Sequence, residues 1–214
     1  MPATAHTDTV VIIPARLASS RLPDKPLADI GGLPMIVQVW KRAMEADIGP
    51  VIVAAGDQSI VDAVTDRGGE AVMTDTDLPS GSDRITAALA EIDPDRTFRR
   101  VVNLQGDLPT IDPALLRAVL RPLDVLDTDI ATLAVATNDP IERNDPNVVK
   151  AIIAFQTDLG PTNTDQMRAG GDELGRALYF TRAAAPSGPG PVYHHIGIYA
   201  YQRTALERFA MLRP

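Results

Sequence analysis

The segment Thr9-Val-Val-Ile-Ile-Pro14 decides the fold expected for this chain of 214 residues. It is a short apolar run rich in β-branched residues, the pattern of a parallel strand buried on both faces. Residues 34–44 follow with apolar side chains on one helical stripe. The alternation then recurs, with strands expected at 50–55, 71–73 and 100–104 and helices at 58–67, 82–92 and 113–126. A three-layer, doubly wound α/β fold with a mostly parallel, mixed sheet is predicted.

The second half of the chain is less regular. Strands are expected at 129–137, 148–155, 177–181 and 192–201, and a helix through Leu206 and Phe209. Residues 156–175 are polar and rich in glycine, so a mobile loop is predicted there. With 45% hydrophobic residues the chain can bury one sizeable core, and a single domain over 1–214 is predicted.

Composition excludes several classes of function. A formal net charge of −8 repels the phosphate backbone of nucleic acids, so no nucleic-acid partner is expected. The absence of cysteine excludes disulfides, thiolate metal sites and cysteine nucleophiles. No apolar run is long enough to span a bilayer and no targeting signal is recognised, so no membrane partner is expected and a cytoplasmic location is predicted.

The loop after the first strand, residues 14–26, is the strongest candidate for phosphate binding. It carries Arg16, Arg21 and Lys25, which suit phosphate oxygens. Small residues between them allow backbone N–H groups to approach an anion. The alternative is a solvated basic loop paired with surface carboxylates. Neither the P-loop nor the dinucleotide-binding glycine pattern is present, which leaves kinases and nicotinamide dehydrogenases unsupported.

A second loop, Gln105-Gly106-Asp107, follows the strand expected at 100–104. Magnesium is usually held by one or two carboxylates together with substrate phosphates, so Asp107 is a candidate Mg²⁺ ligand facing the basic loop. The alternative is that Gly106 and Asp107 simply make a turn.

A third loop, residues 78–84, leads into a predicted helix. Ser80, Ser82 and Arg84 offer hydroxyls and a guanidinium that could bind a ribose or a base. The alternative is that Ser82 is an ordinary N-cap of that helix.

Three further polar residues follow in the second half. His194 and His195 lie in a strand whose alternation sends them to opposite faces, so they are not expected to share a metal. A histidine on a buried face is more often a hydrogen-bonded core residue than a catalyst. Arg182 ends the strand at 177–181 and could bind a substrate carboxylate, with a surface salt bridge as the alternative.

Taken together, six segments closely resemble the 3-deoxy-manno-octulosonate (Kdo) cytidylyltransferase family, also called CMP-Kdo synthetases. They occur in the family's order from about Val10 to the chain end: Val-Ile-Ile-Pro-Ala-Arg16, Ser20-Arg21-Leu-Pro-Asp-Lys25-Pro26-Leu, Gln105-Gly-Asp107, Asp145-Pro-Asn147-Val-Val-Lys150, Ala177-Leu-Tyr-Phe-Thr-Arg182 and His195-Ile-Gly-Ile-Tyr199.

The resemblance implies a nucleotidyltransferase-like fold and a Mg²⁺-dependent transfer of CMP from CTP to the anomeric hydroxyl of Kdo. Pyrophosphate would be released, the product would serve lipopolysaccharide biosynthesis, and the enzyme would be a homodimer. Arg16, Lys25 and Asp107 are implied as the catalytic residues, with Asp107 as the metal ligand. The implied nucleotide site comprises Ala15, Arg16, Arg21, Lys25, Ser80, Ser82, Arg84 and Gln105. The implied sugar-acid site comprises Gln105, Arg182, His195 and Tyr199.

The sequence also departs from the family. Leu108 stands where Glu often follows Gln-Gly-Asp, and Asp24 stands where Gly is usual. Family members continue beyond the equivalent of Pro214 with a segment whose Asp completes the metal site, and that segment is expected to be missing here. Two alternatives remain open: an enzyme resembling CMP-sialic acid synthetase, and a truncated nucleotide-binding protein without catalysis.

Overall fold

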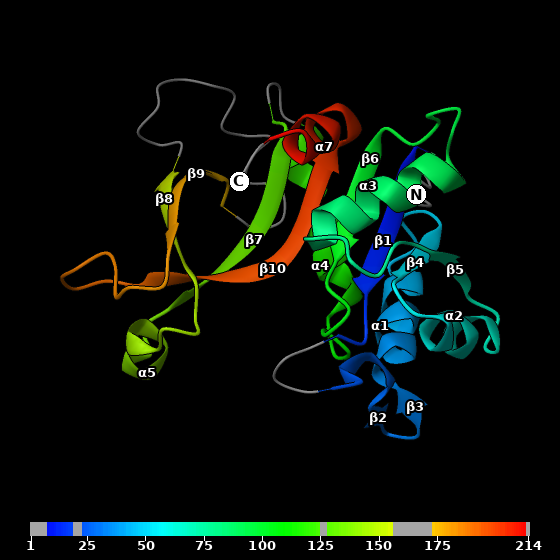
Figure 1. The fold of residues 1–214 in the computed structure, drawn as a ribbon. Helices are drawn as coiled ribbons and strands as arrows, with labels where there is room; N and C mark the ends of the chain where they lie inside the picture. Colours follow the sequence, from blue (N-terminus) through cyan, green and yellow to red (C-terminus); the bar gives the residue numbers. More distant parts are fainter. Residues whose placement is uncertain (1–7, 19–22, 125–127, 156–172, 213–214) are drawn as a thin grey trace. The chain divides into compact units, whose positions relative to one another are not determined.

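The computed structural model describes residues 8–18, 23–124, 128–155 and 173–212 (Figure 1). The chain divides by its internal contacts into two compact units. The first comprises Met1–Ala131 with Gly197–Pro214, and the second comprises Thr132–Ile196. The single domain expected over 1–214 stays a prediction. Within the described residues, no helix has the length and apolar character needed to cross a membrane.

The sheet of the first unit is mostly parallel. β1 (Thr9–Ala15) pairs in parallel with β4 (Val51–Ala55) on one side and with β6 (Arg100–Leu104) on the other. β5 (Glu70–Met73) extends the sheet in parallel beyond β4. The end of β10 (Val192–Gln202) pairs antiparallel with β6, which places Ile198 opposite Leu104. The mixed, mostly parallel sheet predicted from the sequence is confirmed.

Helices cover both faces of this sheet (Figure 1). α3 (Gly81–Ile92) and α7 (Arg203–Ala210) pack together, and their apolar side chains share a core cluster with Val10 and Ile12 of β1. Val11 and Ile13 alternate with these residues and are also fully buried, so they face the opposite side of the sheet. On that side α1 (Met35–Met44) packs on β1 and contacts α2 (Gln58–Thr65) and α4 (Pro113–Ala118). The predicted three-layer arrangement is confirmed.

Short elements complete the first unit. A 3-10 helix, η1 (Lys25–Leu27), and the two-stranded pair of β2 (Asp29–Ile30) and β3 (Leu33–Pro34) connect β1 to α1. A second 3-10 helix, η2 (Arg121–Asp124), follows α4.

The second unit is built on antiparallel strands. β8 (Lys150–Phe155) pairs antiparallel with β9 (Gly175–Thr181) and with the start of β10. β7 (Ile130–Thr137), whose first two residues belong to the first unit, pairs with β10. The short helix α5 (Pro140–Asn144) lies between β7 and β8 in the chain. β9 is exposed along most of its length.

The structure corrects some boundaries predicted from the sequence. The single helix predicted over 113–126 is wrong, because α4 ends at Ala118 and η2 follows it. Pro122 explains the break, since proline lacks the N–H that a continuing helix needs. Asp112 caps α4 as predicted, its Oδ1 accepting the Ala114 N–H at 2.9 Å. α5 was not predicted, because five residues carry no recognisable apolar stripe.

Two other boundaries also shift. The strand expected at 148–155 begins at Lys150, and Gly175 belongs to β9 rather than to the predicted mobile loop. Residues 156–172 of that predicted loop lie outside the described residues.

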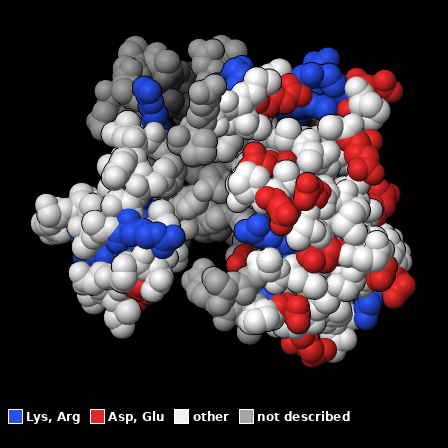
Figure 2. Space-filling view, in the orientation of Figure 1, with Lys and Arg blue, Asp and Glu red and all other residues white. Residues whose placement is uncertain are grey.

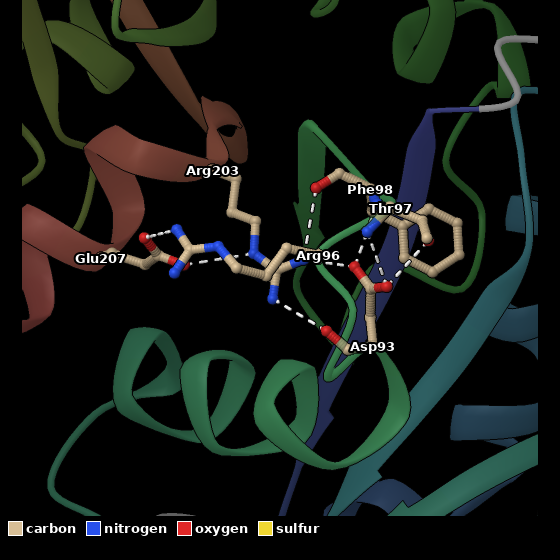
Figure 3. A network of polar contacts seen from close by, with 6 residues as sticks. All are labelled: Asp93, Arg96, Thr97, Phe98, Arg203 and Glu207. Atoms are coloured by element: carbon tan, nitrogen blue, oxygen red, sulfur yellow. Dashed lines mark hydrogen bonds and ion pairs between the residues drawn. The ribbon is translucent and has the colours of Figure 1, made fainter.

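A buried ion pair anchors α7 to the connection between α3 and β6 (Figure 3). The Arg203 guanidinium contacts the Asp93 carboxylate, and the two side chains are 8% and 4% exposed. The same carboxylate accepts the backbone N–H groups of Thr97 and Phe98 at 2.8 and 2.9 Å. Burial alone would raise the pKa of Asp93, but these hydrogen bonds, with those from the Thr97 hydroxyl and Arg203, lower it to about 2. Glu207 joins the network through Arg203 and Arg96.

We expect Asp93→Asn to destabilise the chain by about 3 kcal/mol at pH 7, because Arg203 is left buried beside a neutral amide. The carboxylate has a lower pKa in the folded than in the unfolded chain. It therefore contributes stability above the unfolded value of about 3.8, and this contribution is lost as the pH falls through about 2. The shift corresponds to about 2 kcal/mol.

Urea denaturation of both proteins between pH 7 and pH 3 tests this expectation. The stability gap between the original chain and Asp93→Asn should narrow as the pH falls. Asp95→Asn, at an exposed acidic residue two positions away, is the matched control and should leave stability nearly unchanged. A gap independent of pH would contradict the role given to the carboxylate.

Candidate functional site

A cavity of about 170 Å³ opens in the first unit beyond the carboxyl ends of β1 and β6. Its lining residues come from all three loops that the sequence analysis singled out: Pro14, Ala15, Arg16, Leu78, Ser80, Gly81, Arg84 and Gln105. Because β1 and β6 are parallel neighbours, the loops after them emerge at the same edge of the sheet. The structure therefore brings these predicted loops together around one pocket.

Arg16 and Leu17 begin the basic loop and are held in place by polar contacts. The Arg16 guanidinium donates a hydrogen bond to the Leu78 carbonyl at 3.3 Å, and the Leu17 N–H donates to the Asp57 carboxylate at 2.8 Å. Arg16 is exposed and lines the pocket. The start of the loop is thus fixed to Asp57 and Leu78, and the Arg16 guanidinium lies at the pocket wall. Arg21 lies outside the described residues.

Arg84 is part of the pocket wall and is only 2% exposed. Its guanidinium donates to the Thr74 hydroxyl at 2.5 Å and to the Thr76 carbonyl at 3.1 Å. A Cβ added to Gly56 would lie 2.8 Å from Arg84 Nη1, so this close packing requires glycine. Burial, the main cause, and the charge of Arg16 lower the pKa of Arg84, whereas Asp57 and Asp75 raise it. Arg84 therefore holds residues 74–76 against the pocket.

The loop before α3 is closed by its own capping residue. Ser80 is the N-cap: its hydroxyl accepts the Asp83 N–H at 3.2 Å and donates to the Asp83 carboxylate at 2.6 Å. The alternative that Ser82 is the N-cap is wrong, because α3 begins one residue before it, at Gly81. The Ser82 side chain instead acts to lower the pKa of the Tyr201 hydroxyl, against the larger effect of burial.

A polar chain beneath the pocket was missed by the sequence analysis. Gln105 Nε2 donates to Asn103 Oδ1 at 3.2 Å, and the Asn103 side chain in turn acts to lower the pKa of the Tyr201 hydroxyl, against the larger effect of burial. Asn103 and Tyr201 are 3% and 4% exposed, and burial raises the pKa of Tyr201. The sequence did contain a signal for this contact. Asn103 is a lone amide inside the apolar strand β6, and a buried polar side chain needs a hydrogen-bond partner. The hydrogen bond to Asn103 fixes the side-chain amide of Gln105 at the pocket wall.

Lys25 and Asp107 lie together although 82 positions separate them. Lys25 Nζ lies 2.7 Å from Asp107 Oδ2, and the side chains are 36% and 50% exposed. Gly106 permits the approach of this turn to β1, since a Cβ there would lie 3.1 Å from the Pro14 carbonyl oxygen. Exposed ion pairs are worth at most about 1 kcal/mol, so this pair can exchange partners readily when an anion or a cation binds.

The residues predicted to face the sugar acid divide between the units. Gln105 and Tyr199 belong to the first unit, whereas Arg182 and His195 belong to the second. Tyr199 lies beside Tyr201, with ring centroids 6.1 Å apart, and burial raises its pKa.

In the second unit, Arg182 and His195 have partners of their own. Arg182 Nη1 donates to the carbonyls of Pro146 and Asn147 at 3.1 and 3.2 Å. His195 Nε2 lies 2.9 Å from the Thr132 hydroxyl, and its ring packs edge-on against Phe180. Burial, together with the charge of His194, lowers the pKa of His195.

The fold is that of a nucleotidyltransferase, and the family model described as cytidylyltransferase matches residues 10–214. The 3-deoxy-manno-octulosonate cytidylyltransferase of Parvibaculum lavamentivorans is 55% identical over 96% of this chain and 74% of its own length. The enzyme of the same name from Rhodospirillum centenum is 57% identical over 98% of this chain and 77% of its own length. The chain belongs to the 3-deoxy-manno-octulosonate cytidylyltransferase family.

A solved structure agrees with this family assignment, and a more distant one shares the fold. A CMP:2-keto-3-deoxy-manno-octonic acid synthetase complexed with CTP is 34% identical, with a TM-score of 0.81 over 97% of this chain and 79% of that one. A 4-diphosphocytidyl-2C-methyl-D-erythritol synthase from Anaerococcus prevotii, 13% identical, has a TM-score of 0.57 over 97% of this chain and 78% of that one, and so shares the fold.

Asp24 has a backbone conformation that is unusual for a residue with a Cβ. Asp24 adopts φ 54° and ψ 21°, in the left-handed region that favours glycine. We expect Asp24→Gly to be more stable than Asp24→Ala by about 1 kcal/mol, because alanine keeps the Cβ that crowds this conformation. Both variants remove the same charge, so the difference reports the backbone alone. Urea denaturation measures it, and equal stabilities would contradict the expectation.

Proposed function

We propose that the chain catalyses the transfer of CMP from CTP to the anomeric hydroxyl of Kdo, with release of pyrophosphate. This reaction makes an activated sugar for lipopolysaccharide biosynthesis. The observation that carries the proposal is the pocket lined by all three loops, in a chain 55% identical to a 3-deoxy-manno-octulosonate cytidylyltransferase. The related synthetase solved with CTP supports the choice of nucleotide.

The nucleotide would occupy the pocket of the first unit. Arg16 and Lys25, together with Arg21, would neutralise the triphosphate, since guanidinium and ammonium groups suit phosphate oxygens. The part of the pocket that receives the cytidine would be formed by Ala15, Ser80, Ser82, Arg84 and Gln105. Because Arg84 is bonded to Thr74 and Thr76, we assign it to the wall of this site.

The donor set near Asp107 is compatible with Mg²⁺. In the described part of the chain no group of three or more His, Cys, Asp or Glu side chains could hold a metal, so a complete protein cage is not formed there. Magnesium is usually held by one or two carboxylates and substrate phosphates, and Asp107 is an exposed carboxylate beside the basic loop. A bound Mg²⁺ would supply positive charge at the phosphates. Asp107 would be its ligand from this chain.

The chain's own residues would act by positioning and charge. The anomeric hydroxyl would attack the α-phosphorus in line, the bond from that phosphorus to the bridging oxygen would break with its electron pair leaving on pyrophosphate, and the hydroxyl proton would pass to solvent water. Negative charge spreads over phosphate oxygens in the transition state, where the preorganised cations Arg16 and Lys25 stabilise it. Lys25 lies at this edge beside Asp107 and can exchange that exposed partner for a phosphate when CTP binds.

Arg182 and His195 of the second unit, and Gln105 and Tyr199 of the first, stay proposed as sugar-acid contacts on the family resemblance alone. Arg182 is the natural partner for the carboxylate of the sugar acid, because a guanidinium matches a carboxylate in shape and charge. The relatives named above act on Kdo by their names, which favours Kdo over sialic acid as the acceptor.

Further assignments stay predictions. A homodimer would cover exposed apolar side chains on β9, among them Leu178 and Tyr179, which are 60% and 66% exposed. A single catalytic domain and a cytoplasmic location are proposed on the sequence analysis alone.

Pyrophosphate release by the 214-residue chain with CTP and Mg²⁺ tests the function. We expect release with Kdo, and none with sialic acid or without sugar. CTP binding is measured in parallel by calorimetry. Binding without release would favour the non-catalytic alternative, and release with sialic acid instead of Kdo would overturn the choice of acceptor.

Lys25→Ala and Asp107→Ala should each lower turnover roughly a hundredfold, as the loss of a single preorganised charge at a transition state does. Stability should change little, because their ion pair is exposed. Lys41→Ala removes an exposed lysine of α1 and is the matched control. Turnover near the original level in either site variant, with Lys41→Ala also unaffected, would refute the assigned roles.

A further inference from the structure

Lys150 is a fully buried lysine in the second unit. It opens β8, is 0% exposed, and is among the largest completely buried side chains in the described residues. Its ammonium group donates to the Asp145 carbonyl at 2.6 Å and to the Arg182 carbonyl at 3.4 Å. The ion pairs of the described residues do not include Lys150, so the charge is satisfied mainly by neutral oxygens.

A buried cation of this kind is costly. Taking an ammonium group out of water costs several kcal/mol, which carbonyl dipoles offset only in part. A methionine would fill a similar volume without that cost. We therefore expect the ammonium group to fix the two carbonyls that it binds, which an apolar side chain would not do.

Lys150 and the Arg182 guanidinium bind neighbouring carbonyls of the same turn. Arg182 Nη1 donates to the carbonyls of Pro146 and Asn147, the two residues after Asp145. Lys150 binds the Asp145 carbonyl at the start of this turn and the carbonyl of Arg182 itself. Lys150 also lies opposite Thr181 in the β8–β9 register, one residue before Arg182.

The turn is further closed by the Asp145 side chain. Its carboxylate accepts the backbone N–H of Asn147 at 2.8 Å and the Asn147 side-chain amide at 2.9 Å. These bonds, chiefly the one from the Asn147 backbone, lower the pKa of Asp145, and the charge of Lys150 contributes. Residues 145–147 therefore present three carbonyls to two cations, Lys150 from the interior and Arg182 from the surface.

We propose that Lys150 is a positioning residue that fixes the Arg182 guanidinium for the carboxylate of the sugar-acid substrate. The inference rests on the proposed function, in which Arg182 binds that carboxylate. The guanidinium bonds to the turn use Nη1, which leaves its other nitrogens to face an anion. Figure 2 shows Lys and Arg side chains gathered on the visible face of the second unit with few acidic ones, a surface suited to an anionic sugar.

The test is a double-substitution cycle of Lys150→Met and Arg182→Gln, assayed by pyrophosphate release. Lys150→Met should raise KM for Kdo about ten-fold, as the loss of a well-placed charged hydrogen bond does, and change KM for CTP less than about two-fold. If Lys150 acts through Arg182, adding Lys150→Met to Arg182→Gln should raise KM for Kdo little further. Equal increases in both KM values, or multiplicative effects of the two substitutions, would overturn the inference.

Val192→Ala is the matched control for stability, because it opens a cavity at a fully buried position of the same unit. It should lower the melting temperature without separating the two KM values. If Lys150→Met does not fold, Lys150→Gln is used instead, because it keeps a shorter, uncharged donor. It should likewise raise KM for Kdo while leaving KM for CTP nearly unchanged.

Two readouts separate this inference from the proposed function. If the original chain releases no pyrophosphate with Kdo, the proposed function fails before any variant is compared. A crystal structure of Lys150→Met then decides the positioning role alone. We expect the Arg182 guanidinium to leave the carbonyls of Pro146 and Asn147, and a guanidinium that stays on them would overturn the inference.

Discussion

Val10 and Ile12 of β1 pack beneath α3 and α7, while Val11 and Ile13 are equally buried on the other face of the sheet. A strand buried on both faces has to pair on both edges as well, because its N–H and C=O groups are out of reach of water. β4 and β6 provide that pairing, both in parallel with β1. The carboxyl end of β1 is thereby held between two strands that point the same way, and the pocket at that edge depends on this arrangement.

The strands and helices around β1 were predictable because they follow periodic patterns. Buried parallel strands have apolar runs, and α1 and α3 have apolar stripes, so their residues carry the signal locally. The interruption after Ala118 and the five-residue helix α5 depend on a single proline and on a short capped turn. Such features give no periodicity, so sequence patterns alone assign them poorly.

The candidate site was predictable in its loops but not in its contacts. Arg16, Arg84, Asp107 and Lys25 stand out as charged residues beside strand and helix ends, which is visible in sequence. That Lys25 meets Asp107, or that Gln105 rests on Asn103, depends on strand order and register. Asn103 was recognisable as an unusual residue in β6, but its partner Tyr201 lies in β10, nearly a hundred positions later. Long-range pairs of this kind become visible only when the sheet is assembled.

The cations of this protein fall into two groups that have different electrostatic consequences. Arg203 contacts a buried carboxylate, so most of its field is cancelled where it lies, whereas the ion pair of Lys25 is exposed and can open when an anion binds. Arg84, Arg182 and Lys150 are bonded mainly to carbonyl or hydroxyl oxygens, which fix their positions without a carboxylate in direct contact. An enzyme that binds a polyphosphate and a sugar acid needs cations that are both ordered and uncompensated, because attraction to an anion scales with net charge while ordering limits the entropy lost on binding. Bonding cations to neutral oxygens meets both needs in a chain whose overall charge is negative.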